Sequence, residues 1–209
     1  MSTAVELPGV PFPLMPSDPD AWRVDEHGTV VASAPAGTDL FVSPGGSDGP
    51  DGGGQALLNA VTLLGEPQSG DLQLGAQVSV DFRARFDAGV LLVWLDETHW
   101  AKLCFERSPS GAPMVVSVVT RGTSDDANGF VVTDPTVWLR ISRVGRVYAF
   151  HASIDGQTWE LVRVFELTDD VSGHRLGLEV QAPTGPGCMA TFERVRLTAT
   201  TLEDLRDGS

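Results

Sequence analysis

Short apolar runs separated by turn-forming residues constrain the fold of this chain more than any other feature. Ten runs of strand length, rich in Val, Leu, Phe and Trp, alternate with clusters of Gly, Pro, Asp and Ser, and helical periodicity is hard to find. They are Ala56–Leu64, Ala76–Phe86, Gly89–Asp96, His99–Glu106, Met114–Arg121, Val137–Val144, Val147–Ile154, Glu160–Leu167, His174–Gln181 and Met189–Leu197. Because one sheet rarely carries so many strands, the sequence predicts an all-β protein with two packed antiparallel sheets.

The 209 residues fit one sandwich domain, which we expect over residues 1–200, followed by a tail at 201–209. An early hairpin is expected over residues 22–32, around His27 and Gly28. Residues 43–54 are too rich in Gly and Pro for regular structure, so we expect a long surface loop there, either a tolerated insertion or a lid. In the tail, residues 201–206 could form one helical turn.

The charge balance excludes several classes of function. Acidic residues outnumber basic ones by 28 to 14, giving a net charge of −14, which disfavours binding to nucleic acid or to an anionic membrane. The chain shows no signal-peptide pattern and no apolar run of about 18 residues. Cys104 and Cys188 lie far apart, and the four histidines are scattered, so we expect a cytoplasmic protein without a disulfide, cofactor or metal site. Calcium at residues 124–128 is the open alternative to a solvated turn there.

Alternation along the strands suggests a polar face. In the run from 99 to 106, Ala101, Leu103 and Phe105 form the core set, so their even-numbered neighbours point the other way. The same alternation applies to the runs that begin at residues 114, 137 and 147. If these strands are neighbours, one sheet carries an outward polar face with the candidate ligand-binding residues Trp100, Lys102, Glu106, Arg121, Trp138, Arg140, His151 and Ser153.

Several short motifs occur in an order that resembles the DUF1349 family. They are Thr38-Asp39-Leu40-Phe41, Asp87-Ala88-Gly89-Val90-Leu91-Leu92, His99-Trp100-Ala101-Lys102, Ser117-Val118-Val119-Thr120-Arg121, Trp138-Leu139-Arg140-Ile141 and Ser153-Ile154-Asp155-Gly156-Gln157-Thr158-Trp159. The resemblance spans about residues 22 to 197. It implies a concanavalin A-like jelly roll, related in fold to legume lectins and glucanases, and kinship with proteins labelled regulators of enolase. Where the family commonly reads Ser-Asp-Trp-Ser, this chain has Ser124-Asp125-Asp126-Ala127 and lacks the aromatic residue.

Three functions remain open at this point. The first is a non-catalytic module that binds a carbohydrate or related polyol on the polar face, where Trp100 and Trp138 would stack and the charged residues would hold hydroxyl groups. The second is a glycoside hydrolase or lyase-like enzyme that uses Glu106, although the Glu-x-Asp-x-x-Glu strand of related glucanases has no counterpart here. The third is a protein-interaction or regulatory domain, and the oligomeric state is open.

Overall fold

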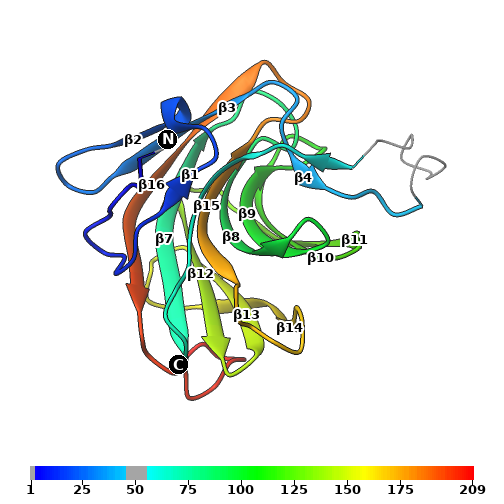
Figure 1. Ribbon diagram of the computed structural model, residues 1–209. Coiled ribbons are helices and arrows are strands. Elements are labelled where there is room, and N and C mark those ends of the chain that lie inside the picture. The colour runs from blue at the N-terminus through cyan, green and yellow to red at the C-terminus, as the bar shows by residue number, and fades with distance from the viewer. Residues whose placement is uncertain (1–2, 46–55) are drawn as a thin grey trace.

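The computed structural model describes residues 3–45 and 56–209, and almost all regular structure in it is β. Two seven-stranded antiparallel sheets pack face to face, and a small two-stranded sheet lies beside them (Figure 1). Within the described ranges the one helical element is the three-residue turn Pro19–Ala21. No helix in these ranges is long and apolar enough to cross a membrane. The prediction of an all-β, two-sheet antiparallel sandwich is confirmed.

The first sheet has the strand order β1-β6-β15-β8-β9-β10-β11. Its strands are β1 Met15–Pro16, β6 Val61–Gly65, β15 Arg175–Gln181, β8 Ala88–Asp96, β9 His99–Arg107, β10 Pro113–Arg121 and β11 Thr123–Val131. The second sheet has the order β14-β13-β12-β7-β16-β3-β2. Its strands are β14 Glu160–Glu166, β13 Val147–Ser153, β12 Val137–Val144, β7 Leu72–Asp81, β16 Gly187–Thr198, β3 Val30–Pro35 and β2 Trp22–Val24. The small sheet pairs β4 Leu40–Phe41 with β5 Leu57–Leu58.

The main core lies between the two large sheets and follows the strand alternation. Leu103 and Phe105 of β9 belong to it from the first sheet, and Leu139, Ile141 and Phe150 belong to it from the second. All five side chains are fully buried. Burial of these large apolar side chains, each worth about 1.5–3 kcal/mol, is the main force that holds the sheets together.

The strand predictions agree closely with the structure, with one clear omission. Nine of the ten runs each overlap a single strand, the run 56–64 divides into β5 and β6, and the hairpin over residues 22–32 is β2 and β3. The stretch at 124–128 lies within β11, so the expectation of a solvated turn there is wrong. Its Asp, Asn and Gly residues have low strand propensity, but as an exposed edge strand it needs no apolar alternation.

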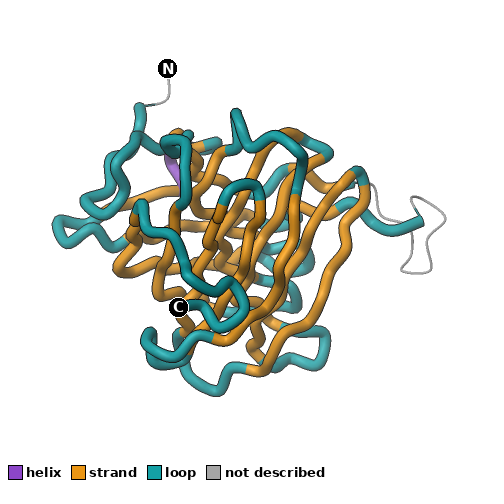
Figure 2. Tube along the Cα trace, turned by 90° about the horizontal axis from the view of Figure 1, so that it is seen from below, coloured by secondary structure: helices purple, strands orange, loops and turns teal. Residues whose placement is uncertain are grey.

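Two further predictions concern segments outside the sheets. The Gly-rich loop at 43–54 falls almost wholly outside the described residues. The tail makes one closed turn near residues 204–208, where the Gly208 N–H donates to the Asp204 carbonyl at 3.0 Å. In Figure 2 the C-terminal segment runs across strands of a sheet rather than away from the molecule.

Candidate functional site

Polar side chains gather on the face of the first sheet that points away from the core. In Figure 1 strands β8 to β11 curve strongly, and β4 lies at the open side of this curve. The register places Gln181 of β15 opposite Ala88 of β8, and Ala88 opposite Glu106 of β9, so these side chains share one face. Lys102 and Glu179 have the same parity as Glu106 and Gln181 on their strands. We call this surface the concave face.

Lys102 is the centre of the polar cluster on the concave face. Its side chain is only 2% exposed, and its Nζ donates to Asp39 Oδ1 at 2.9 Å and to Gln181 Oε1 at 2.7 Å. The Gln181 amide in turn donates to the Phe86 carbonyl at 3.0 Å. Because Gln181 is two strands away from β9, the Lys102 side chain reaches over β8 to make this contact. The long lysine stem therefore links β9, β15 and the segment before β4.

A flap formed by β4, β5 and their flanking residues covers one end of the concave face. Leu40 and Ala60 pack there against Trp100, and Val42 is packed against the same cluster. Trp100 is 0% exposed, so it is part of a small second core and not an open stacking plane. The expectation that Trp100 lines an open face is wrong, because the flap folds over this end of β9, which no local pattern predicted.

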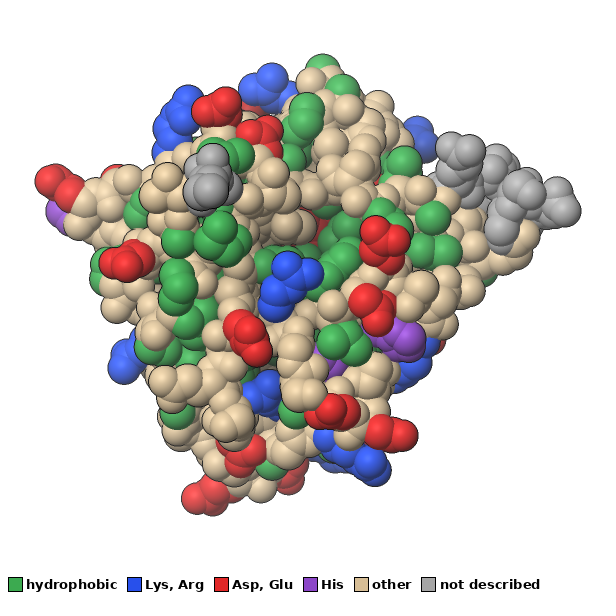
Figure 3. Space-filling model, viewed as in Figure 1, with side chains coloured by type: hydrophobic (Ala, Val, Ile, Leu, Met, Phe, Trp, Pro, Cys, Tyr) green, Lys and Arg blue, Asp and Glu red, His purple; other side chains and the backbone are tan. Residues whose placement is uncertain are grey.

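Beside the charged cluster the concave face has an apolar floor. It consists of Ala88, Val90, Cys104, Met114 and Val116. The space-filling view shows a hollow beside the segment that carries β4, with green apolar side chains around it and acidic atoms at its base (Figure 3). An apolar floor with a few converging polar groups is the usual composition of a small-molecule site.

The carboxyl groups of this cluster are electrostatically unusual. Burial raises the pKa of Glu106 to about 8, and the charge of Lys102 only partly opposes this. Burial likewise raises the pKa of Glu179 to about 7. For Lys102, burial alone would lower the pKa, but the nearby carboxylates of Asp39 and Glu179 outweigh it and raise the pKa above its ordinary value. Lys102 is therefore charged, whereas Glu106 and much of Glu179 are protonated near neutral pH.

Glu179 stands out within the cluster. It is 0% exposed, and neither carboxyl oxygen has a hydrogen-bond partner among the residues that the structure describes. Buried polar atoms are nearly always hydrogen-bonded, and an unpaired one costs about 1–3 kcal/mol. The same residues hold no group of three or more His, Cys, Asp or Glu side chains arranged for a metal ion. The Glu179 carboxyl group can accept hydrogen bonds from a polar organic group and, when protonated, donate one to it.

The structure separates the eight residues predicted to line one polar face. Trp100, Lys102 and Glu106 lie on the concave face, but the other sheet holds Trp138, Arg140, His151 and Ser153. The assumption that β9 and β10 neighbour β12 and β13 is wrong, because each pair belongs to a different sheet. Arg121 is the last residue of β10 and shares the parity of Val119, which lies in the main core, so the expectation that Arg121 shares a face with Lys102 is wrong. Its guanidinium donates to the Glu166 carbonyl. Arg121 and His99 line a shallow pocket there with Glu166, Leu167, Thr168 and Asp169.

The four residues on the second sheet form what we call the outer patch, and the C-terminal tail covers part of it. Arg140 donates to the Gly208 carbonyl at 2.8 Å, and His151 Nε2 donates to the Leu205 carbonyl at 2.9 Å. The Arg140 guanidinium also lies 4.1 Å from the centre of the Trp159 ring. Burial lowers the pKa of His151 to about 4, assisted by the charge of Arg140, and burial lowers the pKa of Arg140 to about 10.

The remaining two residues of the outer patch serve the turn after β13. The Ser153 hydroxyl donates to Asp155 Oδ1 at 3.0 Å and accepts from the Gly156 N–H at 2.9 Å. Gly156 has φ +71° and an added Cβ would lie 2.8 Å from the Trp138 ring, so this turn packs directly on Trp138. Both side chains therefore have structural partners within the chain.

Three residues of the concave cluster were not among the predicted site residues. Glu179 and Gln181 alternate with Leu176, Leu178 and Val180 in the run 174–181, so the parity argument used for β9 would have placed them on the polar face. Asp39 lies outside any strand-length run, and only its place in the Thr38-Asp39-Leu40-Phe41 motif marked it.

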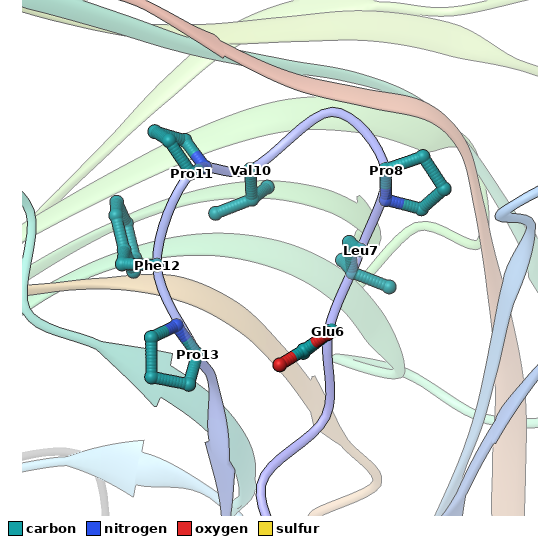
Figure 4. Close-up of a pocket in the computed structure, with 7 residues that line it drawn as sticks. All are labelled: Glu6, Leu7, Pro8, Val10, Pro11, Phe12 and Pro13. Atoms are coloured by element: carbon teal, nitrogen blue, oxygen red, sulfur yellow. The ribbon is translucent and has the colours of Figure 1, made fainter.

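A second hollow lies in the N-terminal segment and has a different character. It is lined by Glu6, Leu7, Pro8, Val10, Pro11, Phe12 and Pro13. Figure 4 shows these side chains arranged round a single loop, with Glu6 as the one charged group. Since no polar groups from different strands converge there, we do not regard this hollow as the site.

Comparisons with known structures agree with the observed architecture. A functionally unknown protein from Saccharomyces cerevisiae matches with a TM-score of 0.77 and 25% identity, over 90% of this chain and 97% of that one. A variant of the GH43 protein BlXynB from Bacillus licheniformis matches with a TM-score of 0.70 and 13% identity, over 90% of this chain but 37% of that one. An alginate lyase from Klebsiella pneumoniae matches with a TM-score of 0.52 and 14% identity, over 88% and 86% of the two chains.

The last two likenesses concern the fold alone, and they fit the expected concanavalin A-like jelly roll. No curated protein matches the chain in sequence. The model of the family described as "Protein of unknown function (DUF1349)" matches residues 16–200. This match covers most of the chain, and the chain therefore belongs to the DUF1349 family.

Proposed function

We propose that this protein is a binding module whose concave face holds a small polyhydroxylated ligand of the carbohydrate class. The observation that carries the proposal is the buried, unpaired carboxyl group of Glu179. A sugar hydroxyl can donate to such a group and accept from its protonated form. The apolar floor beside it suits the C–H face of a sugar ring.

The two buried glutamates of the cluster support a ligand-binding role over a purely structural one. A structural ion pair is complete when its partners satisfy each other, as Lys102 and Asp39 do here. Within the part of the chain that the structure describes, neither Glu106 nor Glu179 forms an ion pair, and burying them costs stability that packing alone would not require. Proteins keep costly groups of this kind mainly at functional sites.

A thermal-shift screen of the whole chain against neutral sugars, amino sugars and sugar acids tests the proposal. A ligand at 100 times its dissociation constant adds about 2.7 kcal/mol to the free energy of unfolding, which raises the melting temperature measurably. Glu179→Leu should remove this shift because it deletes both carboxyl oxygens. The matched control is Glu193→Leu, an exposed glutamate on β16 of the second sheet, which should keep it.

Either of two results would contradict the proposal. One is the absence of a shift with every sugar in a protein that melts cooperatively. The other is a shift of equal size in wild type and Glu179→Leu, which would place binding away from the concave face.

A second candidate function is acid catalysis on a glycosidic bond. It is favoured by the pKa of Glu106 at about 8, since a carboxyl group that stays protonated at neutral pH is what a general acid requires. In that case oligosaccharide cleavage should be lost in Glu106→Gln and should decline above about pH 8. Reducing-end assays on wild type at pH 6 that detect no product from any bound oligosaccharide would eliminate this candidate.

A further inference from the structure

We propose that the concave face selects ligands that carry a positive charge, of the amino-sugar class, over neutral sugars and over sugar acids. This inference rests on the proposed function, because it names the substrate class of the same site. It follows from the count of charges in the cluster and from which of them already have partners.

Acidic groups outnumber cations on the concave face. Asp39, Glu106 and Glu179 surround Lys102, and Asp126 of β11 lies near enough to influence Glu106. The one cation is already engaged, because Lys102 Nζ donates to Asp39 and to Gln181. Among the residues that the structure describes, Glu106 at the concave face and Glu179 buried beneath it therefore form no ion pair.

The second observation is the unpaired state of Glu179. Both of its oxygens are buried without a partner among the described residues, so a group that brings several donors gains most there. An ammonium group carries three donors and one positive charge, whereas a hydroxyl group carries one donor and no charge. A hydrogen bond in which one partner is charged is about twice as strong as one between two neutral groups.

A sugar acid would have the opposite effect. Its carboxylate gains no ion pair there, because Lys102 is already paired with Asp39, and it opposes the ionisation of Glu106 and Glu179 that an ammonium group favours. Sugar phosphates are disfavoured on the same grounds, and the net charge of −14 extends this preference to the approach of the ligand.

Binding of a cation should also release protons. The groups that face Glu106 and Glu179 are Lys102 and Cys104 of β9, Asp39 before β4 and Asp126 of β11. With pKa values of about 8 and 7, both glutamates are largely protonated at pH 6.5. An ammonium group beside them favours their ionised forms, so protons leave the site as the ligand binds.

The test is isothermal titration calorimetry of the full chain at pH 6.5 with glucosamine, glucose, N-acetylglucosamine and glucuronate, in two buffers of different ionisation enthalpy. We expect glucosamine to bind at least about tenfold more tightly than the two neutral sugars, glucuronate to bind most weakly, and glucosamine alone to release protons. Glu179→Gln removes the ionisable group but keeps the shape of the side chain, so the ratio of the affinities for glucosamine and glucose should fall toward one. Glu193→Gln is the control and should behave as wild type.

The outcomes separate the two proposals. Equal affinity for glucose and glucosamine, tighter binding of glucuronate, or a preference that persists in Glu179→Gln would overturn the charge selectivity and leave the sugar-binding function standing. Absence of binding by all four sugars, in a protein that unfolds cooperatively, would overturn both.

Discussion

The concave face of the first sheet and the outer patch of the second both bury charged side chains. The two regions differ in how the hydrogen bonds of these side chains are satisfied. On the outer patch Leu205 and Gly208 of the tail accept from His151 and Arg140, although His151 Nδ1 and Arg140 Nε have no partner among the residues that the structure describes. On the concave face Lys102 is paired, whereas Glu179 has no partner among the residues that the structure describes. The charged side chains of the outer patch thus each have at least one partner within the chain, whereas the carboxyl group of Glu179 has none among the described residues.

The presence or absence of partners within the chain distinguishes a structural polar cluster from a binding site. A covered patch such as Arg140 and His151 contributes to stability and offers little to a ligand. A buried acidic group that remains unpaired lowers stability and offers a strong contact to whatever binds it. The following predictions test this contrast, in order of decreasing effect.

Removal of the central cation should have the largest effect. Lys102→Met leaves the half-buried Asp39 and the buried Gln181 without their partner, so we expect a loss of about 3–5 kcal/mol in the free energy of unfolding, measured by urea denaturation. The parallel change Arg140→Met should cost less, about 1–2 kcal/mol, because its partners are a neutral carbonyl and an aromatic ring. Equal losses in the two variants would remove the contrast between the regions.

The two regions should give pH dependences of opposite sign. Glu106 and Glu179 have pKa values above the ordinary 4.5, so the folded state keeps protons that the unfolded state loses, and stability falls as pH rises from about 5 to about 8. His151 has a pKa of about 4, below its ordinary 6.5, so its contribution is present above pH 6.5 and is lost as pH falls toward 4.

Urea denaturation across pH 4–9 separates these contributions. Glu106→Gln should flatten the decline on the alkaline side, which amounts to a few kcal/mol in wild type, and His151→Gln should flatten the rise on the acidic side. An unchanged alkaline decline in Glu106→Gln would show that this residue does not carry the effect.

Removal of the unpaired carboxyl group should stabilise the protein. Glu179→Leu replaces a buried group that lacks a partner with an apolar one, so we expect a gain of about 1–3 kcal/mol in unfolding free energy, together with loss of sugar binding. Chemical denaturation and calorimetry on the same preparation would measure both. A destabilised variant would indicate that Glu179 is satisfied within the fold and belongs with the structural clusters.

A change in the tail should have the smallest effect and should leave binding intact. Gly208 has φ +79°, and an added Cβ would lie 2.5 Å from Arg140 Nη2, so Gly208→Ala should cost about 1–2 kcal/mol. Gly122 has a similar φ of +76° with nothing within 4 Å of an added Cβ, so Gly122→Ala isolates the backbone contribution and should cost less. Thermal unfolding compares the two, and sugar affinity should equal that of wild type in both.

Local patterns predicted the strands well but could not predict how they are assembled. Alternation in β9 correctly separated Leu103 and Phe105 from Lys102 and Glu106, because the pleat acts within a single strand. It could not show that β12 and β13 belong to the other sheet, since strand pairing depends on long-range contacts. The eight predicted residues are consequently divided between the two sheets.

The candidate site was recovered in part for the same reason. Lys102 and Glu106 follow from parity on one strand, and Glu179 could have followed from parity on another. Asp39 and the burial of Trp100 depend on the flap, whose short strands β4 and β5 carry no periodic signal. Only the folded chain reveals that the flap brings an acidic side chain to Lys102.

A crystal structure of the protein with glucosamine bound would test the central claim most directly. The claim predicts the sugar over the apolar floor of the concave face, with its ammonium group about 3 Å from a carboxyl oxygen of Glu179. The account would be contradicted by a structure in which both Glu179 oxygens are hydrogen-bonded to groups of the chain itself and the sugar is bound elsewhere or not at all.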